Sequence, residues 1–185
     1  MINVGELRKG VVIELDNKTY RVLEYQHIKM GRGGAQARLK LQDVRTKAIF
    51  DRTFSASERF VRSRVEHRPA QYLYNDGDNY YFMDQESYEQ RGVSREVMGD
   101  SVNYLKDGMQ IELAYVGEEP IAADLPPNVV LRVEETDPGF KGDTATGGTK
   151  PARTETGLVV NVPLFVNTGD LIRVRTTDGT YLERA

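Results

Sequence analysis

The residues best suited to a chemical task lie in a glycine-rich stretch that contains a single arginine. Arg32 follows Gly31 and precedes Gly33 and Gly34, and Lys29 lies shortly before it. Glycine has no Cβ atom and adopts positive φ readily, so the chain turns tightly here and exposes the arginine at the tip of a hairpin. A guanidinium keeps its charge at physiological pH and suits contact with phosphate. The alternative is an ordinary turn with a solvated arginine.

A second glycine-rich stretch contains Gly142, Asp143 and Thr144. Its backbone N–H groups are suited to donate to phosphate oxygens or base edges, and the Asp143 carboxylate is suited to accept from a base amino group. The stretch departs from a P-loop because Gly148, rather than lysine, follows Gly147. The alternative is a mobile surface loop.

Residue types that commonly perform catalysis are scarce. The chain has no cysteine, and its two histidines, His27 and His67, are far apart in the sequence. This spacing does not match a metal site, and no nucleophile motif is present. We therefore expect no catalytic residue, no metal ion and no cofactor, and a binding protein rather than an enzyme.

Charge is distributed unevenly along the 185 residues. Residues 1–68 carry 15 Lys and Arg against 8 Asp and Glu, whereas residues 69–128 carry 3 against 12. The remaining residues are close to neutral, and the whole chain has a net charge of −3. A cationic first third on an acidic chain favours a polyanionic partner for that third alone.

The pattern of the elements that carry these loops is almost entirely β. Residues 35–42 alternate between apolar and polar side chains, so Ala35, Ala37, Leu39 and Leu41 should share one face of a strand. Residues 71–83 predict a hairpin that turns at residues 76–78. Its aromatic residues are expected to fill a core rather than to stack on bases: Tyr72, Tyr74, Tyr80, Tyr81 and Phe82. Ser94 should cap one short helix through Met98, Val102 and Leu105.

Prolines and changes in composition divide the chain into three units. We place the boundaries at residues 1–65, 66–128 and 129–185, each a small β-barrel filled by its own side chains. No signal peptide or membrane-spanning run is evident, so we expect a cytoplasmic protein without a membrane partner. We also expect a monomer.

With these motifs in place, the chain resembles the bacterial elongation factor P family over its whole length. The most specific match begins with Lys150-Pro151-Ala152 and continues through Gly157 to Val160-Asn161-Val162-Pro163, Val166 and Gly169. Further matches are Leu7-Arg8-Lys9-Gly10, Tyr25-Gln26-His27, the Arg32 tip and the run Pro138 to Thr144.

The resemblance implies an L-shaped protein with an SH3/KOW-like barrel followed by two OB-fold barrels. It implies a translation elongation factor that binds both ribosomal subunits between the peptidyl and exit sites and promotes peptide-bond formation at consecutive prolines. Arg32 would contact the acceptor end of the peptidyl-tRNA, the Gly142-Asp143-Thr144 loop would lie near mRNA in the exit site, and the second domain would contact the stalk of the large subunit.

The resemblance leaves some alternatives open. Many family members carry a modified lysine at the tip, so Arg32 is either the target of an arginine-modifying enzyme or active without modification. Two other functions compete with the main interpretation. One is an elongation factor P-like paralogue, and the other is a free-standing OB protein that binds single-stranded RNA.

Overall fold

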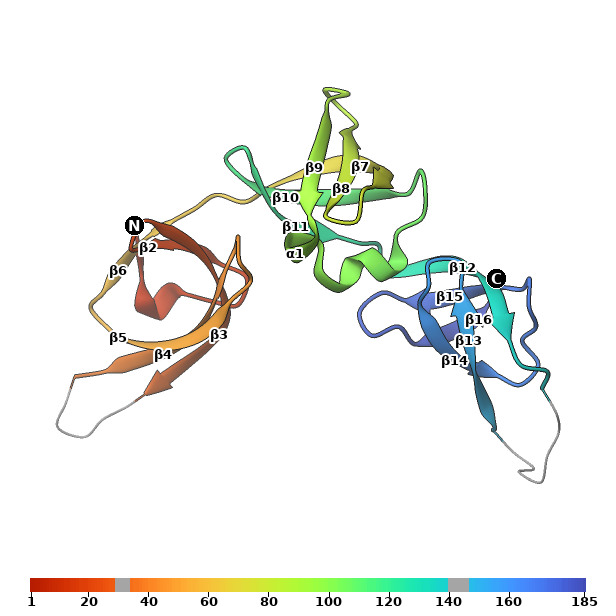
Figure 1. The fold of residues 1–185 in the computed structure, drawn as a ribbon. Coiled ribbons are helices and arrows are strands. Elements are labelled where there is room, and N and C mark those ends of the chain that lie inside the picture. The colour runs from red at the N-terminus through yellow and green to blue at the C-terminus, as the bar shows by residue number, and fades with distance from the viewer. Residues whose placement is uncertain (29–33, 140–146) are drawn as a thin grey trace.

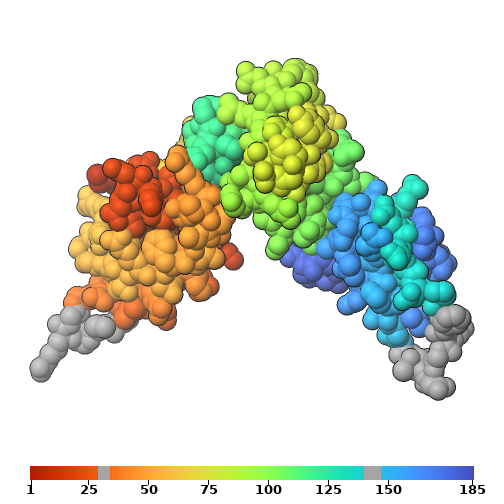
Figure 2. All heavy atoms as spheres, viewed as in Figure 1, coloured from red at the N-terminus to blue at the C-terminus, as the bar shows by residue number. Residues whose placement is uncertain are grey.

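The chain folds into three curled antiparallel sheets that follow one another along the sequence (Figure 1). The computed structural model describes residues 1–28, 34–139 and 147–185. We call the sheets, with their connections, the first, second and third units. Figure 2 shows a bent molecule in which the second unit forms the corner and the first and third units extend from it. The predicted all-β chain of three small units in an L shape is confirmed.

The first unit has the strand order β1-β6-β2-β3-β4-β5. Its elements are β1 Ile2–Asn3, the 3₁₀ helix η1 Val4–Glu6, β2 Val12–Leu15, β3 Lys18–Ile28, β4 Gln36–Asp43, β5 Ile49–Ser55 and β6 Arg59–Arg62. The alternation predicted for β4 is confirmed, because Ala37, Leu39 and Leu41 are buried and Arg38 is exposed. Ala35 is a correction: it precedes the strand and is exposed, so the buried face begins at Ala37.

The second unit has the strand order β11-β10-β7-β8-β9. Its strands are β7 Glu66–Asn75, β8 Asn79–Asp84, β9 Gln90–Ser94, β10 Gln110–Val116 and β11 Glu119–Asp124. The predicted hairpin is β7–β8, and Asp76 closes its turn by accepting hydrogen bonds from the backbone N–H groups of Asp78 and Asn79 at 3.0 and 2.8 Å. Asx turns of this kind fix the register of the strands that they join.

The aromatic residues of this hairpin do not all face the core. Tyr72, Tyr80 and Phe82 are buried in the core, but Tyr74 is 52% exposed and Tyr81 is only partly buried. A bulge between Tyr72 and Tyr74 shifts the register by one residue, which turns Tyr74 to the outer face. The prediction of a shared core position was therefore wrong for Tyr74 and Tyr81.

The one short helix predicted in the second unit is confirmed, but it is shorter than the apolar spacing indicated. The helix α1 spans Arg95–Met98, and Ser94 caps it by accepting from the backbone N–H of Val97 at 3.4 Å. The chain continues as the 3₁₀ helix η2, Gly99–Tyr104. Gly99 ends the α-helix because its φ of +53° leaves the helical region.

The third unit has the strand order β14-β13-β12-β15-β16. Its strands are β12 Asn128–Thr136, β13 Thr149–Thr154, β14 Val159–Pro163, β15 Leu171–Arg175 and β16 Tyr181–Arg184. The edge strands β14 and β16 approach each other, so the sheet curls towards closure. Each unit has its own apolar cluster, with Leu39, Phe82 and Leu131 among the fully buried side chains of the three.

An apolar cluster joins the first unit to the second. Val12 and Val44 of the first unit pack against Ala114 and Ile121 of the second. Polar contacts surround this cluster: Arg45 Nε lies 2.6 Å from Glu119 Oε1, and Lys47 Nζ donates to the backbone carbonyl of Ile121. The junction therefore combines apolar burial with two directional contacts.

A change of pH should reveal the burial of Lys47 in this junction. Burial, helped by the nearby charge of Arg21, lowers the pKa of Lys47 from 10.5 to about 8. Between these two pH values the unfolded chain holds a proton that the folded chain has released, so the free energy of unfolding rises with pH in that window. Between pH 8 and pH 9.5, the free energy of unfolding of the wild type should rise by about 1 kcal/mol relative to that of Lys47→Met. Chemical denaturation at each pH measures this difference.

A matched control separates this effect from general titration of the chain. Lys40→Met also removes one ammonium group, but Lys40 lies on the surface of the first unit in an ion pair with Glu24 at 3.1 Å. The free energy of unfolding of Lys40→Met, relative to that of the wild type, should change little over the same pH range. An equal pH dependence in the two variants would contradict the role of Lys47 burial.

A similar junction joins the second unit to the third. Tyr104 of the second unit is buried in the apolar cluster of the third unit. Lys106 Nζ donates to the backbone carbonyl of Val130 at 3.1 Å and lies 3.1 Å from Glu155 Oε1. Both junctions thus place a lysine of one unit on a backbone carbonyl of the next.

None of the helices in the described ranges has the length and apolar character of a membrane-spanning segment.

Candidate functional site

The sequence-predicted site residues fall mainly outside the residues that the structure describes. Lys29, Gly31, Arg32 and Gly33 lie outside the described ranges, and so does the second loop, Gly142-Asp143-Thr144. Gly34 is described and is exposed. The structure therefore bears on the two loops through the strands that carry them.

A long two-stranded arm carries the Arg32 stretch. The strands β3 and β4 pair from Tyr20↔Asp43 to Ile28↔Gln36, so the arm extends to the residues next to the loop. The strand β5 pairs with β4 from Gln42↔Ile49 to Gln36↔Ser55 and supports the arm along its length. At about 3.3 Å per residue, a paired strand of this length positions its end far from the barrel core.

The outer face of this arm is not a free cationic surface. Arg38 forms an ion pair with Asp51 at 3.1 Å, and Lys40 forms one with Glu24 at 3.1 Å. The sequence predicted a partly basic face, but the neighbouring strands supply carboxylates opposite these cations. General attraction of RNA to this face is therefore reduced.

Two side-chain contacts fix the base of the second loop. Lys150 on β13 is only 7% exposed, and its Nζ donates to the backbone carbonyl of Asp137 at 2.5 Å. The Thr136 hydroxyl donates to the carbonyl of Pro151 at 2.9 Å. These contacts tie the end of β12 to the start of β13, where the described chain meets the loop.

Gly139 makes a close backbone approach at the same base. A Cβ atom at this position would lie 2.1 Å from the carbonyl oxygen of Leu164. Only glycine fits such a contact without a shift of the backbone. In the sequence, Lys150 and Gly139 stand out only as parts of the family-like motifs, because their structural partners, Asp137 and Leu164, are not adjacent to them.

The two loop bases lie at opposite ends of the bent molecule. Figure 1 shows the ends of β3 and β4 at the far end of the first unit and the ends of β12 and β13 at the far end of the third. The second unit separates them. One molecule can therefore contact two well-separated parts of a large partner at once.

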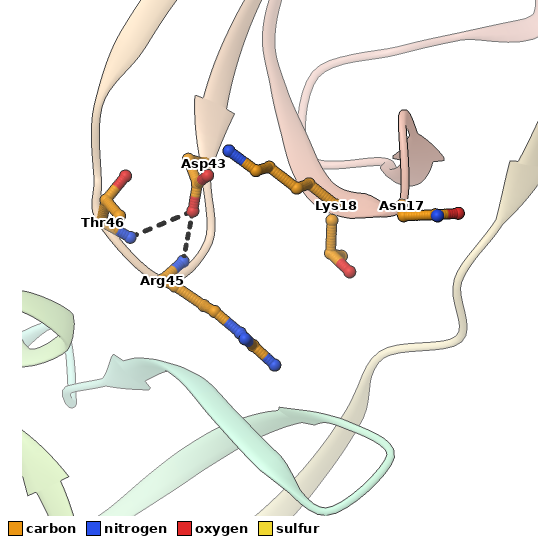
Figure 3. Close-up of a pocket in the computed structure, with 6 residues that line it drawn as sticks. Asn17, Lys18, Asp43, Arg45 and Thr46 are labelled. Atoms are coloured by element: carbon orange, nitrogen blue, oxygen red, sulfur yellow. Dashed lines mark hydrogen bonds between the residues drawn. The ribbon is translucent and has the colours of Figure 1, made fainter.

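A polar cavity of about 190 Å³ lies beside the first junction, between the β2–β3 and β4–β5 turns (Figure 3). Asp43 accepts hydrogen bonds from the backbone N–H groups of Arg45 and Thr46 at 2.8 and 3.0 Å. Burial alone would raise the pKa of Asp43, but these hydrogen bonds outweigh it and lower the pKa. The Arg45 side chain leaves the cavity towards the second unit, where it meets Glu119.

The Asp43 and Arg45 side chains of this cavity are engaged in the turn and in the junction. One carboxylate oxygen, Asp43 Oδ1, accepts from two backbone donors, and the Arg45 guanidinium pairs with Glu119 in the junction. In the described part of the chain, no three His, Cys, Asp or Glu side chains come together as a metal site requires.

Comparison with known protein families assigns the whole chain to one family. Three family models match it in succession: the Elongation factor P (EF-P) KOW-like domain over residues 3–60, the Elongation factor P (EF-P) OB domain over residues 65–123, and Elongation factor P, C-terminal, over residues 129–184. The chain belongs to the elongation factor P family. The predicted resemblance is confirmed.

Curated relatives in the elongation factor P family agree with this assignment. An elongation factor P from Moorella thermoacetica is 51% identical over 185 residues and covers 100% of both chains. One from Thermoanaerobacter sp. is 48% identical over 184 residues, again with 100% coverage of both. These full-length matches leave no part of the chain outside the family.

A solved structure supports the fold of this elongation factor P family member. The structure titled eukaryotic translation initiation factor 5A from Methanococcus jannaschii matches with a TM-score of 0.52 and 23% identity. The match covers 65% of this chain and 86% of the other. The KOW-like and OB descriptions agree with the predicted barrel types of the first and second units. Family membership gives the chain a role in translation elongation, at the ribosome.

Proposed function

We propose that this chain binds the ribosome between the peptidyl and exit sites and promotes peptide-bond formation at consecutive prolines. Arg32 contacts the acceptor end of the peptidyl-tRNA. The observation that carries the proposal is the paired β3–β4 arm, which extends to the residues beside the Arg32 stretch in a chain that belongs to the elongation factor P family. We also propose the domain division 1–65, 66–128 and 129–185 and a cytoplasmic location.

We propose two further contacts, which the family resemblance implies for the other units. The Gly142-Asp143-Thr144 loop lies near mRNA in the exit site, at the end of the molecule opposite the arm. The second unit, at the corner, contacts the stalk of the large subunit. Support comes from the separation of the two loop bases and from the contacts of Lys150 and Gly139 that fix the second base.

The chemistry of proline explains why such a factor acts without catalytic residues. The proline ring fixes φ and restricts the geometries that its nitrogen can adopt during attack. Holding a flexible tRNA end in a reactive geometry lowers the entropic part of the barrier. Arg32 supplies a charge that is always present at physiological pH, either unmodified or after action of an arginine-modifying enzyme. Peptide transfer itself remains the reaction of the ribosome.

A reconstituted translation system tests this function directly. Messages that encode three consecutive prolines should be completed faster when the full chain is added, by about tenfold or more, whereas matched messages with alanine should be unaffected. The purified chain should also sediment with ribosomes and not with naked RNA. Equal stimulation of both messages, or tight binding to naked RNA, would favour the free-standing RNA-binding alternative.

A further inference from the structure

Two tyrosines form an exposed stacked pair on the second unit. Tyr74 of β7 and Tyr81 of β8 are directly opposite each other, with ring centroids 4.7 Å apart and ring planes 21° apart. Tyr74 is 52% exposed. An aromatic pair of this size on an outer face presents a flat apolar surface with an electron-rich face.

The surroundings hold Tyr81 in a fixed position. Gly92 of β9 lies opposite Tyr81, and a Cβ atom there would come within 3.1 Å of the Tyr81 ring, so the ring lies against bare backbone. On the other side Tyr74 covers it. The Tyr81 hydroxyl donates to Asp76 Oδ2 at 2.9 Å, and this carboxylate is itself fixed by the turn. The Tyr81 ring, on which Tyr74 stacks, is therefore preorganised.

The charge around the pair is negative. Residues 69–128 carry 12 acidic and 3 basic side chains. Two of the three cations are used elsewhere, since Arg91 pairs with Glu118 at 3.0 Å and Lys106 pairs with Glu155 at 3.1 Å. The third, Arg95, is exposed beside the turn, where its backbone N–H donates to the carbonyl of Asp78 at 2.9 Å. The exposed carboxylates of Asp76 and Asp78 lie in the turn next to the pair. Phosphate groups are repelled by such a surface, and cations are attracted.

Several other aromatic rings in this protein are covered by an arginine. Arg184 lies over the exposed Phe165 at 5.5 Å, Arg8 over Tyr25 at 5.9 Å, and Arg68 over Tyr115 at 4.5 Å. Among the described residues, no arginine or lysine lies over Tyr74 or Tyr81. In the described part of the chain, the pair therefore lacks the cation–π partner that these other rings have.

We propose that the Tyr74–Tyr81 pair is a docking surface for an arginine-bearing segment of a basic protein. A guanidinium stacks on the open face of Tyr74 while the carboxylates of Asp76 and Asp78 compensate its charge. A nucleic acid would also stack on tyrosine, but its phosphates would face the acidic turn. The inference rests on the second unit and does not depend on the Arg32 contact.

Binding of short labelled peptides to the full-length chain tests the proposal. The probes are an acetylated hexapeptide of alternating arginine and glycine, the same peptide with lysine, and a six-nucleotide single-stranded RNA, each followed by fluorescence anisotropy at low ionic strength. The arginine peptide should bind more tightly than the lysine peptide, because only the planar guanidinium stacks well on a ring. The RNA should bind more weakly than either.

Variants of the pair give the decisive comparison. Tyr74→Leu should weaken binding of the arginine peptide about threefold to thirtyfold, the range of ordinary cation–π contacts, whereas Tyr74→Phe should retain it. The matched control is Tyr88→Leu, since Tyr88 is 71% exposed in the β8–β9 turn and outside the pair. The affinity of Tyr88→Leu for the arginine peptide should stay within twofold of the wild-type value.

Three results would overturn the proposal. One is no binding of the arginine peptide, and another is equal loss of affinity in Tyr74→Leu and Tyr88→Leu, which would indicate attraction by net charge alone. The third is tighter binding of the RNA than of the peptide, with loss of RNA binding in Tyr74→Leu. Because no ribosome or tRNA is present, these outcomes are independent of the outcome for consecutive prolines. Thermal unfolding followed by circular dichroism confirms that each variant is folded.

Discussion

Arg32→Ala should leave the chain folded and remove most of its stimulation of translation at consecutive prolines. The charged contact with the tRNA end is lost, and such contacts are worth about 1.5–3 kcal/mol, which corresponds to a tenfold or larger loss of stimulation. The arm itself should persist, because the β3–β4 pairing and the buried face of Leu39 and Leu41 do not involve Arg32. The measurement is the rate of peptide formation on a triproline message in the reconstituted system.

Removal of another arginine from the same unit provides the control. Arg62 lies on β6 and is exposed, so Arg62→Ala changes the net charge of the first unit by the same amount. Stimulation should remain close to the wild-type value. Intact mass of the natively expressed chain, compared with its activity, shows whether modification of Arg32 is required. Full stimulation by Arg32→Ala would rule out the proposed contact.

Gly139→Ala should disrupt the base of the second loop. The added methyl group would lie 2.1 Å from the carbonyl oxygen of Leu164 and 2.9 Å from its carbonyl carbon. Both are backbone atoms, so no side-chain rotation relieves the clash and the chain must shift. We expect a loss of about 1–3 kcal/mol in the free energy of unfolding, measured by chemical denaturation. Stimulation at consecutive prolines should fall as well, because the loop is displaced from its base.

The same substitution at an open glycine shows whether the clash is responsible. Gly5 has no atom within 4 Å of an added Cβ, and its φ is not positive. Gly5→Ala should therefore change stability by no more than about 0.5 kcal/mol. If Gly139→Ala were as stable as Gly5→Ala, the close approach to Leu164 would not constrain the loop base.

Local patterns predicted the strands that position the loops. The alternation around Leu39 fixed the buried face of β4, and the Asp76-Gly77 turn between aromatic runs predicted the β7–β8 hairpin. Both signals depend only on neighbouring residues, so one sequence is sufficient to read them. The family motifs then identified the function class.

Features that depend on the exact register or on distant residues could not be predicted. One bulge between Tyr72 and Tyr74 moved an expected core residue to the surface, and no local signal marks that bulge. Lys47 and Lys106 look like ordinary surface lysines in the sequence. Their acceptors, the carbonyls of Ile121 and Val130, are 74 and 24 residues away and become neighbours only in the folded chain.

These two junctions also affect how the chain tolerates sequence change. In each, the acceptor is a main-chain oxygen, which every amino acid provides. Exchange of the Ile121 or Val130 side chain for another apolar one therefore leaves the acceptor in place, and no compensating mutation is needed to restore the hydrogen bond. For these two hydrogen bonds the residue type therefore matters mainly on the donor side, at Lys47 and Lys106.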